Sequence, residues 1–524
     1  MSAPDPLPAP PDAPGPRTYA EALEAIESRG RYGIHLGLGR VRALLQAMGD
    51  PERSVRGALV AGTNGKGSVI ALAGSALRAA GHRVGETPKP HLVTYRERIV
   101  VDGRPIDAAD FARLVDEALP VADHVTRRLG PPTEFELLTA VMFRHFAEAH
   151  LDVALVEVGL GGRLDATNAW DGGVAVLTNV GLDHTDRLGP TIAAIAREKA
   201  AIVKRGDLAV TGADGDALAI LRRRCARLAV PLAVAVPPPV LGWTRDALSV
   251  DLPGLGPTGV GLRGRHQAAN AAVADALLDA LERAGIAAVS PEARRRGYAA
   301  ARWAGRLELV SVPVARTGSG SFQAGARDRE VATVSGSARD REVATVSGSA
   351  TDREVATTRE VATVSGSATD REVLLDGAHN PDGAAALARA LTDLRPHLAG
   401  GGETPPPPLT VVWASMADKD VAGVIAAVAG SPAMTGATVV CTALDLPRAL
   451  PAADLADAWR AGLPGADIRV APTPDLALDL ALRTGRGPVV VAGSLYLVGA
   501  ARARLVDDPS LRDPEPAPRL PGGA

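Results

Sequence analysis

Short apolar runs alternate along the chain with stretches whose apolar residues recur every three or four positions. The runs are typical of buried strands, and the recurring spacing is typical of helices with one apolar face. The expected strands occupy residues 58–61, 151–156, 174–180, 409–414, 438–442 and 488–492. Because strands and helices alternate, we expect an α/β fold with mostly parallel sheets, divided into domains at 18–300 and 301–506.

A glycine-rich turn follows the first apolar run and precedes the helical stretch 69–80. The turn consists of Gly62, Thr63, Asn64, Gly65, Lys66, Gly67 and Ser68. A strand, a glycine turn and a helix N-terminus form an anion site, because backbone N–H groups and the helix dipole point at the anion. The Lys66 ammonium adds positive charge, and the Ser68 hydroxyl can bind Mg²⁺.

The strict phosphate-loop pattern is not met by this turn. That pattern requires glycine where Val60 stands and serine or threonine where Gly67 stands. An ordinary glycine-rich loop is therefore the alternative interpretation. The phosphate-loop interpretation makes the first domain an N-terminal phosphate-loop ATPase domain with a mostly parallel sheet, and the second a C-terminal Rossmann-like α/β domain.

Two further polar side chains stand where apolar runs end. Glu157 follows the run 151–156, and His184 follows the run 174–180. In open parallel sheets, ligands bind beyond the carboxyl ends of the strands. We therefore expect Lys66, Glu157 and His184 at one edge, where they suit one or two Mg²⁺ ions bridging the phosphates of ATP. The alternative is a surface glutamate and a hydrogen-bonded loop histidine.

Lys199 lies on the apolar face of the predicted helix 191–203, in line with Ile192, Ile195 and Ile202. A lysine on such a face ordinarily extends its ammonium to water. A partly desolvated lysine is instead more easily neutral. A neutral amine can take up carbon dioxide as a carbamate, which is an additional anionic metal ligand. The sequence leaves both interpretations open.

Composition and charge exclude several classes of function. The 524 residues carry a net charge of −3, so no basic patch indicates nucleic-acid binding. Two cysteines, Cys225 and Cys441, cannot form a disulfide framework or a cysteine metal site, which suits a reducing compartment. We see no signal-peptide pattern and no apolar run of about 18 residues. We therefore expect a cytoplasmic protein without a membrane span.

Three segments have compositions that cannot bury a core. Residues 1–17 and 507–524 are rich in proline and are expected to be disordered tails. Residues 316–370 contain a tandem repeat of small polar units, which we interpret as a disordered insertion at a hairpin tip, formed by duplication of the start of the next strand. A binding or adhesive role for the repeat is the alternative.

The ordered motifs resemble those of the folylpolyglutamate synthase and dihydrofolate synthase family, which belongs to the Mur ligase superfamily. The resemblance spans roughly 18–505 apart from the insertion and rests on residues 62–68, 90–92, 157–168, 182–185, 197–199, 266–270, 303–308, 376–381, 417–420 and 493–496. It implies an ATP-dependent amide ligase. ATP would phosphorylate a substrate carboxylate, and the amine of L-glutamate would attack the acyl phosphate.

The resemblance also implies roles for individual residues. Residues 62–68, Asn270, Arg306 and Asp376 would bind ATP, and Ser68, Glu157 and His184 would hold Mg²⁺. Lys66, His379 and a carbamoylated Lys199 would be catalytic. The pterin or folate would contact Leu36, Thr133, Phe135, Glu136, Asp165 and Ala166. The acceptor would be dihydropteroate, the γ-carboxyl of tetrahydrofolate, or both, and we expect a monomer.

Lys89 departs from the family pattern. Many relatives place a serine before the Pro-His-Leu of residues 90–92, and that serine helps to bind magnesium. An ammonium cannot be a metal ligand. Either Thr87 or water substitutes, or Lys89 itself neutralises phosphate charge.

Three rival functions remain. A Mur-type ligase for a nucleotide-linked peptide would need a larger domain than the about 60 residues before the phosphate loop. A nucleotide-binding module without catalysis would tolerate loss of Glu157 and Lys199, but this sequence has both residues. A repeat-bearing interaction protein would use the ligase body as a scaffold.

Overall fold

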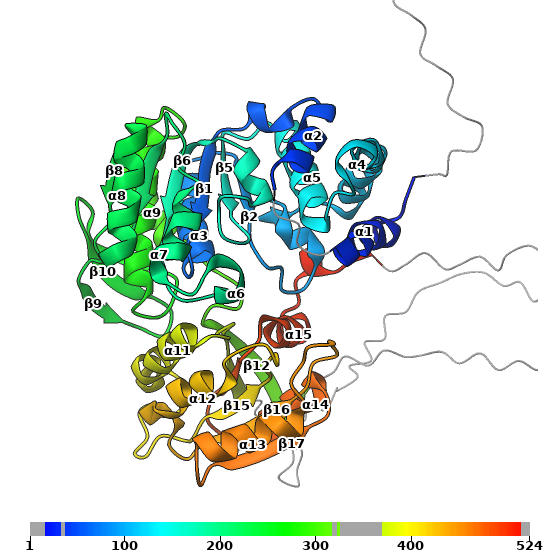
Figure 1. The fold of residues 1–524 in the computed structure, drawn as a ribbon. Helices are drawn as coiled ribbons and strands as arrows, with labels where there is room; N and C mark the ends of the chain where they lie inside the picture. The colour runs from blue at the N-terminus through cyan, green and yellow to red at the C-terminus, as the bar shows by residue number, and fades with distance from the viewer. Residues whose placement is uncertain (1–15, 33–36, 317–321, 325–368, 515–524) are drawn as a thin grey trace, which may run out of the picture.

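The computed structural model of the chain describes residues 16–32, 37–316, 322–324 and 369–514. They form two α/β domains, drawn one above the other in Figure 1. Each domain is built on a sheet whose central strands are parallel, so the expected fold class is confirmed. Within the described ranges, no helix combines the length and the apolar character needed to cross a membrane.

The N-terminal sheet brings three strands of functional interest together at its centre. In spatial order its strands are β4 (Arg104–Pro105), β3 (Val100–Val101), β2 (Val84–Thr87), β5 (Val153–Glu157), β1 (Gly57–Ala61), β6 (Gly173–Leu177), β7 (Leu208–Thr211) and β8 (Leu232–Val234). The strands from β2 to β8 run parallel, and β3 and β4 are antiparallel. Because β5, β1 and β6 are parallel neighbours, the loops that follow them leave from the same edge.

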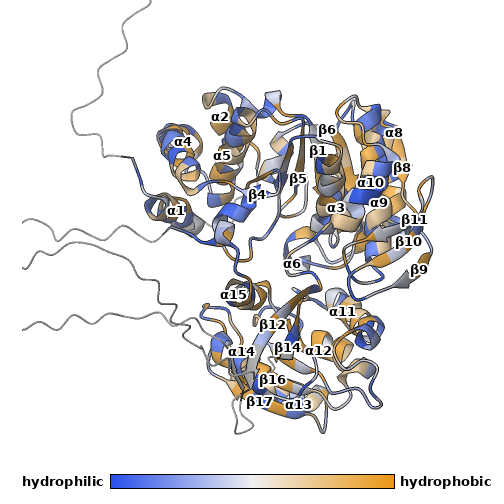
Figure 2. Ribbon diagram, turned by 180° about the vertical axis from the view of Figure 1, so that it is seen from behind, coloured by the Kyte–Doolittle hydropathy of each residue, from blue (hydrophilic) through white to orange (hydrophobic). Residues whose placement is uncertain are grey.

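Helices cover both faces of this sheet. One face packs against α3 (Lys66–Ala79), α9 (Gln267–Arg283) and α10 (Pro291–Ala300), with the small sheet of β9 (Val240–Trp243), β10 (Leu248–Leu252) and β11 (Gly256–Val260) beside them. The other packs against α1 (Tyr19–Glu27), α2 (Gly39–Ala47), α4 (Ala108–Leu129), α5 (Glu134–Glu148), α7 (Ile192–Ala200) and α8 (Gly215–Leu228). Outer helices such as α4 carry both polar and apolar stretches (Figure 2).

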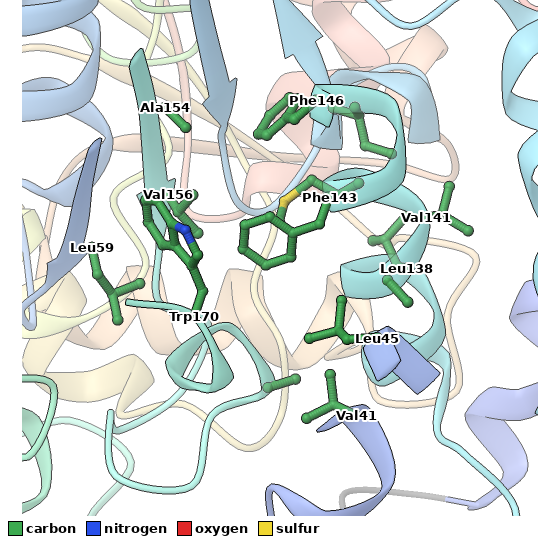
Figure 3. Packing of buried hydrophobic residues seen from close by; sticks show 14 of the residues in the cluster. Val41, Leu45, Leu59, Leu138, Val141, Phe143, Phe146, Ala154, Val156 and Trp170 are labelled. Atoms are coloured by element: carbon green, nitrogen blue, oxygen red, sulfur yellow. The ribbon is translucent and has the colours of Figure 1, made fainter. Parts of the chain in front are cut away.

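The core beneath α5 is organised around two aromatic rings. Phe143 and Trp170 lie with their ring centroids 5.5 Å apart (Figure 3). The Trp170 indole N–H donates to the Val55 carbonyl oxygen at 2.9 Å, so the buried polar atom is satisfied. Burying each ring contributes about 1.5–3 kcal/mol. This core fixes α5, which carries Phe135 in its first turn.

The C-terminal sheet has the spatial order β13 (Phe322–Ala324), β12 (Glu308–Arg316), β14 (Thr369–Leu375), β18 (Val489–Ala492), β15 (Thr410–Trp413), β16 (Thr438–Thr442) and β17 (Asp467–Ala471). The strands from β14 to β17 are parallel. One face packs against α11 (Pro381–Leu394), α12 (Val421–Ala429) and α13 (Ala452–Gly462), and the other against α14 (Pro474–Arg483) and α15 (Leu495–Leu505).

The repeat lies between the two strands of a hairpin. β12 and β14 pair antiparallel from Glu308↔Leu375 to Val314↔Thr369, so the chain leaves and re-enters the sheet at neighbouring positions. An insertion at such a tip leaves the paired strands intact. Within the insertion 316–370, residues 322–324 form β13, which pairs antiparallel with β12, so the disorder predicted for the insertion is wrong there. Residues 317–321 and 325–368 lie outside the described residues, as do 1–15, so the disorder predicted for these residues stays a prediction.

The C-terminal strap, residues 506–514, runs from α15 back to the N-terminal domain, where Figure 1 shows it beside α1. The buried Arg96 guanidinium donates to the carbonyl oxygens of Ser510 at 2.9 Å and Arg512 at 2.8 Å, and to Asp513 Oδ1 at 3.2 Å. The sequence predicts disorder from residue 507, and this is wrong as far as Pro514. A buried guanidinium needs acceptors, and the strap supplies them. Residues 515–524 lie outside the described residues.

Candidate active site

A cavity of about 850 Å³ lies where the two domains meet. Side chains and loops from both sheets reach it. Of the residues predicted from the sequence, it is lined by Thr63, Asn64, Gly65, Lys66, Gly67, Ser68, Phe135, Glu157, His184, Asn270, Arg306, Asp376 and His379. The structure therefore brings most of the predicted nucleotide and metal residues to one place.

The turn after β1 leads into α3, which begins at Lys66. Gly65 has φ 83°, and a Cβ there would lie 2.3 Å from Asn270 Oδ1, so this position requires glycine. The Lys66 ammonium donates to the carbonyl oxygens of Gly62 and Thr63, each at 3.1 Å. The loop thus wraps around its own lysine and leaves the N-terminus of α3 facing the cavity.

Neighbouring elements hold the loop in this shape. The Thr178 hydroxyl, beyond β6, donates to the Asn64 carbonyl oxygen at 2.6 Å, and the Asn64 N–H donates to Asn179 Oδ1 at 2.9 Å. From α9, the Gln267 amide donates to Ser68 Oγ at 3.3 Å. The site is therefore supported by rigid elements on two sides.

Glu157 ends β5 as a buried carboxylate between two lysines. Its Oε1 lies 3.9 Å from the Lys66 ammonium, and its Oε2 accepts the Lys89 N–H at 3.2 Å. Burial raises the pKa of Glu157, and Lys66 and Lys89 oppose this rise. Thr87 accepts the Glu157 N–H at 2.9 Å and is fully buried, so it lies outside the cavity lining.

His184 has φ 49°, a left-handed backbone, and precedes the short helix α6 (Thr185–Leu188). Its Nε2 lies 3.8 Å from Asp183 Oδ2, and burial lowers the pKa of His184. A neutral imidazole can bind a metal ion. A strained backbone at a cavity-lining histidine is a feature that occurs at functional sites.

Lys199 lies on α7, directly behind the phosphate loop. Its ammonium is buried and donates to the Gly62 carbonyl oxygen at 2.9 Å. Burial, followed by repulsion from Lys66, lowers the pKa of Lys199 to about 7. The side chain therefore does not extend to water, in contrast to the ordinary behaviour of a lysine on an apolar face.

Three residues of the C-terminal domain close the other side of the cavity. Asp376 accepts the N–H groups of Leu307 at 2.9 Å and Ala378 at 3.0 Å, and it shapes the turn after β14. The Gly377 carbonyl oxygen accepts a hydrogen bond from His379 Nδ1 at 2.7 Å, and burial lowers the pKa of the His379 imidazole. A Cβ at Gly377 would lie 2.3 Å from an Arg306 nitrogen, so glycine there gives the guanidinium room.

The predicted pterin residues do not all reach the cavity. Phe135 lines it, with the Lys89 ammonium 4.2 Å from its ring centroid. Thr133 and Glu136 form the capping box of α5, and Asp165 accepts the N–H groups of Gly159 and Thr167, each at 3.0 Å. The residues outside the cavity lining are Thr133, Glu136, Asp165 and the buried Ala166, and Leu36 lies outside the described residues.

The cavity also contains residues to which the sequence assigned no role. Trp303 packs against the phosphate loop, since a Cβ at Gly67 would lie 2.4 Å from its ring. Arg98 lines the cavity and donates to His91 Nδ1 at 2.9 Å. Trp303 lies in the motif 303–308, whereas Arg98 lies in none of the motifs, and only the fold brings it to the cavity.

The arrangement suits a ligand that carries phosphates. Lys66, Lys89 and Arg306 act on the buried carboxylate of Glu157, so three cations are grouped at this part of the cavity. Fixed cations in a partly dehydrated cavity stabilise the transfer of a phosphoryl group. Two domains around one cavity can also exclude water from a reactive intermediate.

Comparisons with known proteins agree with this geometry. The Mur ligase middle domain matches residues 60–235, and the Mur ligase glutamate ligase domain matches residues 360–495. Dihydrofolate synthase/folylpolyglutamate synthase of Bacillus subtilis is 38% identical, over 56% of this chain and 70% of its own. The protein of the same name from Mycobacterium tuberculosis is 32% identical, over 91% of each chain.

A solved structure extends the comparison to three dimensions. Escherichia coli FolC in complex with DHPP and ADP superposes with a TM-score of 0.68 at 28% identity, and the match covers 93% of this chain and 97% of that one. The chain therefore belongs to the folylpolyglutamate synthase and dihydrofolate synthase family of Mur ligases, and it is an ATP-dependent ligase.

Proposed function

We propose that the enzyme adds L-glutamate both to dihydropteroate and to the γ-carboxyl of tetrahydrofolate, through an acyl phosphate. The observation that carries this proposal is the single cavity that joins the phosphate loop to Phe135. A nucleotide at the loop and a flat ring at Phe135 place the acceptor carboxylate between them. The two names of the relatives, and the DHPP and ADP held by the Escherichia coli protein, support both acceptors.

The phosphate loop and the C-terminal domain would hold ATP together. Lys66 and the N-terminus of α3 would neutralise the phosphates, and Asn270, Arg306 and Asp376 would fix the rest of the nucleotide. His379 would lie near the transferred phosphoryl group. A carboxylate is a poor electrophile, and phosphorylation gives it a leaving group. Positioning the two reactants is then the main contribution of the protein.

The donors at the cavity fit Mg²⁺. Ser68, Glu157 and His184 offer a hydroxyl, a carboxylate and an imidazole, and the described residues contain no cluster of three acidic, histidine or cysteine side chains that would form a complete cage. Mg²⁺ ordinarily keeps water and phosphate oxygens among its ligands, so an incomplete cage suits it. When bound, the ion would neutralise charge on the phosphates of ATP.

We further propose that Lys199 carries a carbamate. Its buried position and a pKa of about 7 leave a large neutral fraction at physiological pH, and carbon dioxide adds to a neutral amine. The carbamate would place a negative charge behind the loop, beside Gly62. It would thereby offset the crowding of positive charge between Lys199 and Lys66.

The acceptor ring would contact Phe135, through which the start of α5 reaches the cavity. Glu136 lies outside the cavity lining, and its carboxylate accepts the Thr133 N–H and pairs with Arg40. The ring face of Phe135 beneath Lys89 is already covered, so the acceptor would use the opposite face or the ring edge. Thr133 and Asp165 would act by holding this part of the cavity in shape.

One assay separates the candidate acceptors. The purified enzyme is given ATP and labelled L-glutamate with dihydropteroate, and then with tetrahydrofolate. Incorporation with both acceptors is expected. Incorporation with tetrahydrofolate alone would make the enzyme a folylpolyglutamate synthase only, and incorporation with neither would leave a Mur-type ligase for another substrate.

We propose a cytoplasmic monomer. The free thiols of Cys225 and Cys441 are buried, which suits a reducing compartment. Light scattering after size-exclusion chromatography tests the oligomeric state, and a mass near twice the 53.7 kDa of one chain would contradict it.

A further inference from the structure

The half-buried Lys89 presents a cation to the cavity from the end of β2. Its ammonium donates to the Glu157 carbonyl oxygen at 2.6 Å and lies 4.2 Å from the centroid of the Phe135 ring. An ammonium has three N–H donors. In the described part of the chain, no carboxylate forms an ion pair with Lys89, so donors remain available to a ligand.

The position of Lys89 is defined by what lies on each side of it. Glu157 separates it from Lys66 and the phosphate loop, and Phe135 lies on its other side. The order across the cavity is therefore phosphate loop, carboxylate, Lys89 and aromatic ring. A group that contacts Lys89 would therefore lie between the phosphate loop and the Phe135 ring.

Neighbouring charges act on the Lys89 ammonium in both directions. Asp165 and Glu157 attract it, and Arg98 and Lys66, which line the same cavity, repel it. The carboxylate oxygens of Asp165 accept the N–H groups of Gly159, Leu160 and Thr167 and form no ion pair with Lys89. An incoming carboxylate would therefore pair directly with an ammonium that the neighbouring acidic side chains attract only from a distance.

We infer that Lys89 binds the acceptor carboxylate, the group that ATP phosphorylates, and so determines acceptor affinity. This inference rests on the proposed function. In the step concerned, a carboxylate oxygen forms a bond to the γ-phosphorus, the bond from that phosphorus to the bridging oxygen breaks, and ADP leaves. No proton moves. Lys89 holds the carboxylate in line with the phosphorus and keeps its charge paired until the bond forms.

The test compares Lys89→Met, which removes the charge but keeps the stem, with Lys89→Arg, which keeps the charge. Lys204→Met is the matched control, because Lys204 is a half-buried lysine bonded to the Trp170 carbonyl oxygen, away from the cavity. The Michaelis constants for ATP and for dihydropteroate are measured separately, then repeated with tetrahydrofolate. ADP binding by calorimetry shows that each variant is folded.

Lys89→Met is expected to raise the KM for either acceptor by about ten- to a hundredfold, as for loss of a charged hydrogen bond, with the KM for ATP changed less than about twofold. Lys89→Arg should recover part of the acceptor affinity. An unchanged KM for the acceptor, or a rise only in the KM for ATP, would overturn the role of Lys89 and leave the proposed function standing. A wild-type enzyme inactive with both acceptors would overturn the proposed function and the role of Lys89 with it.

Discussion

Replacing Lys66 with methionine removes more than one contact with ATP. The Lys66 ammonium lies 3.9 Å from Glu157 Oε1, and the exposed fractions of the two side chains are only 17% and 5%. Two unit charges about 4 Å apart attract by about 4 kcal/mol at an effective dielectric constant of about 20. Burial raises the pKa of Glu157, and Lys66 is the largest influence that lowers it. Without Lys66, the carboxylate form of Glu157 is therefore less stable.

Lys66→Met should lower acceptor-dependent ADP release by at least about 10²- to 10³-fold, the usual effect of removing one charged group from a transition-state site. The assay is a double-mutant cycle with Glu157→Gln. Because Glu157 depends on Lys66 for its charge, Glu157→Gln should cost less in the Lys66→Met background than in the wild type. Lys66→Arg, which keeps the charge, should lose less activity than Lys66→Met.

Two results would refute this reasoning. Full turnover by a folded Lys66→Met variant would mean that the loop does not bind the phosphates. Strictly additive losses in the cycle would mean that Lys66 and Glu157 act independently, despite the distance between them.

The remaining predictions concern other parts of the chain. Lys199→Ala should lose most activity and regain some with added short carboxylates, which replace the carbamate. Activity assays with and without formate check this, and a failure of formate to restore activity would weaken the carbamate proposal. Deleting residues 320–368 should leave activity intact, because the strands of the hairpin still meet at Val314 and Thr369; a soluble but inactive deletion variant would contradict it. Asp513→Ala should lower the apparent Tm by about 1–3 °C, since solvent limits the ion pair with Arg96 to about 1 kcal/mol. Thermal unfolding measures this shift. Asp507→Ala is the control, because it removes an exposed ion pair with Arg512 and should leave the Tm unchanged.

The sequence predicts those parts of the site that lie at strand ends. Lys66, Glu157 and His184 each follow an apolar run, and parallel strands bring such ends to one edge. Local pattern and sheet topology were sufficient for these features.

Other features depend on partners that are distant in the sequence. Asp165 looks like a free carboxylate in the sequence, but in the fold backbone N–H groups occupy its oxygens. Lys89 looks like a loop lysine until β5 and α5 place Glu157 and Phe135 around it. Composition likewise indicated a disordered tail after residue 507, because the guanidinium that orders it, Arg96, lies 417 residues before its Asp513 partner.

The C-terminal strap changes how the two domains can move. The chain passes between them once after α10 and again through residues 506–514, which end at Arg96 on the N-terminal domain. The strap therefore adds a tether to the hydrogen bonds that Trp243 and Arg265 make to Asp393 on the other domain. Any wide separation of the domains must break the hydrogen bonds of Arg96 to Ser510 and Arg512 or pull the strap away from α15, and cutting the strap would remove this restraint without touching any residue that lines the cavity.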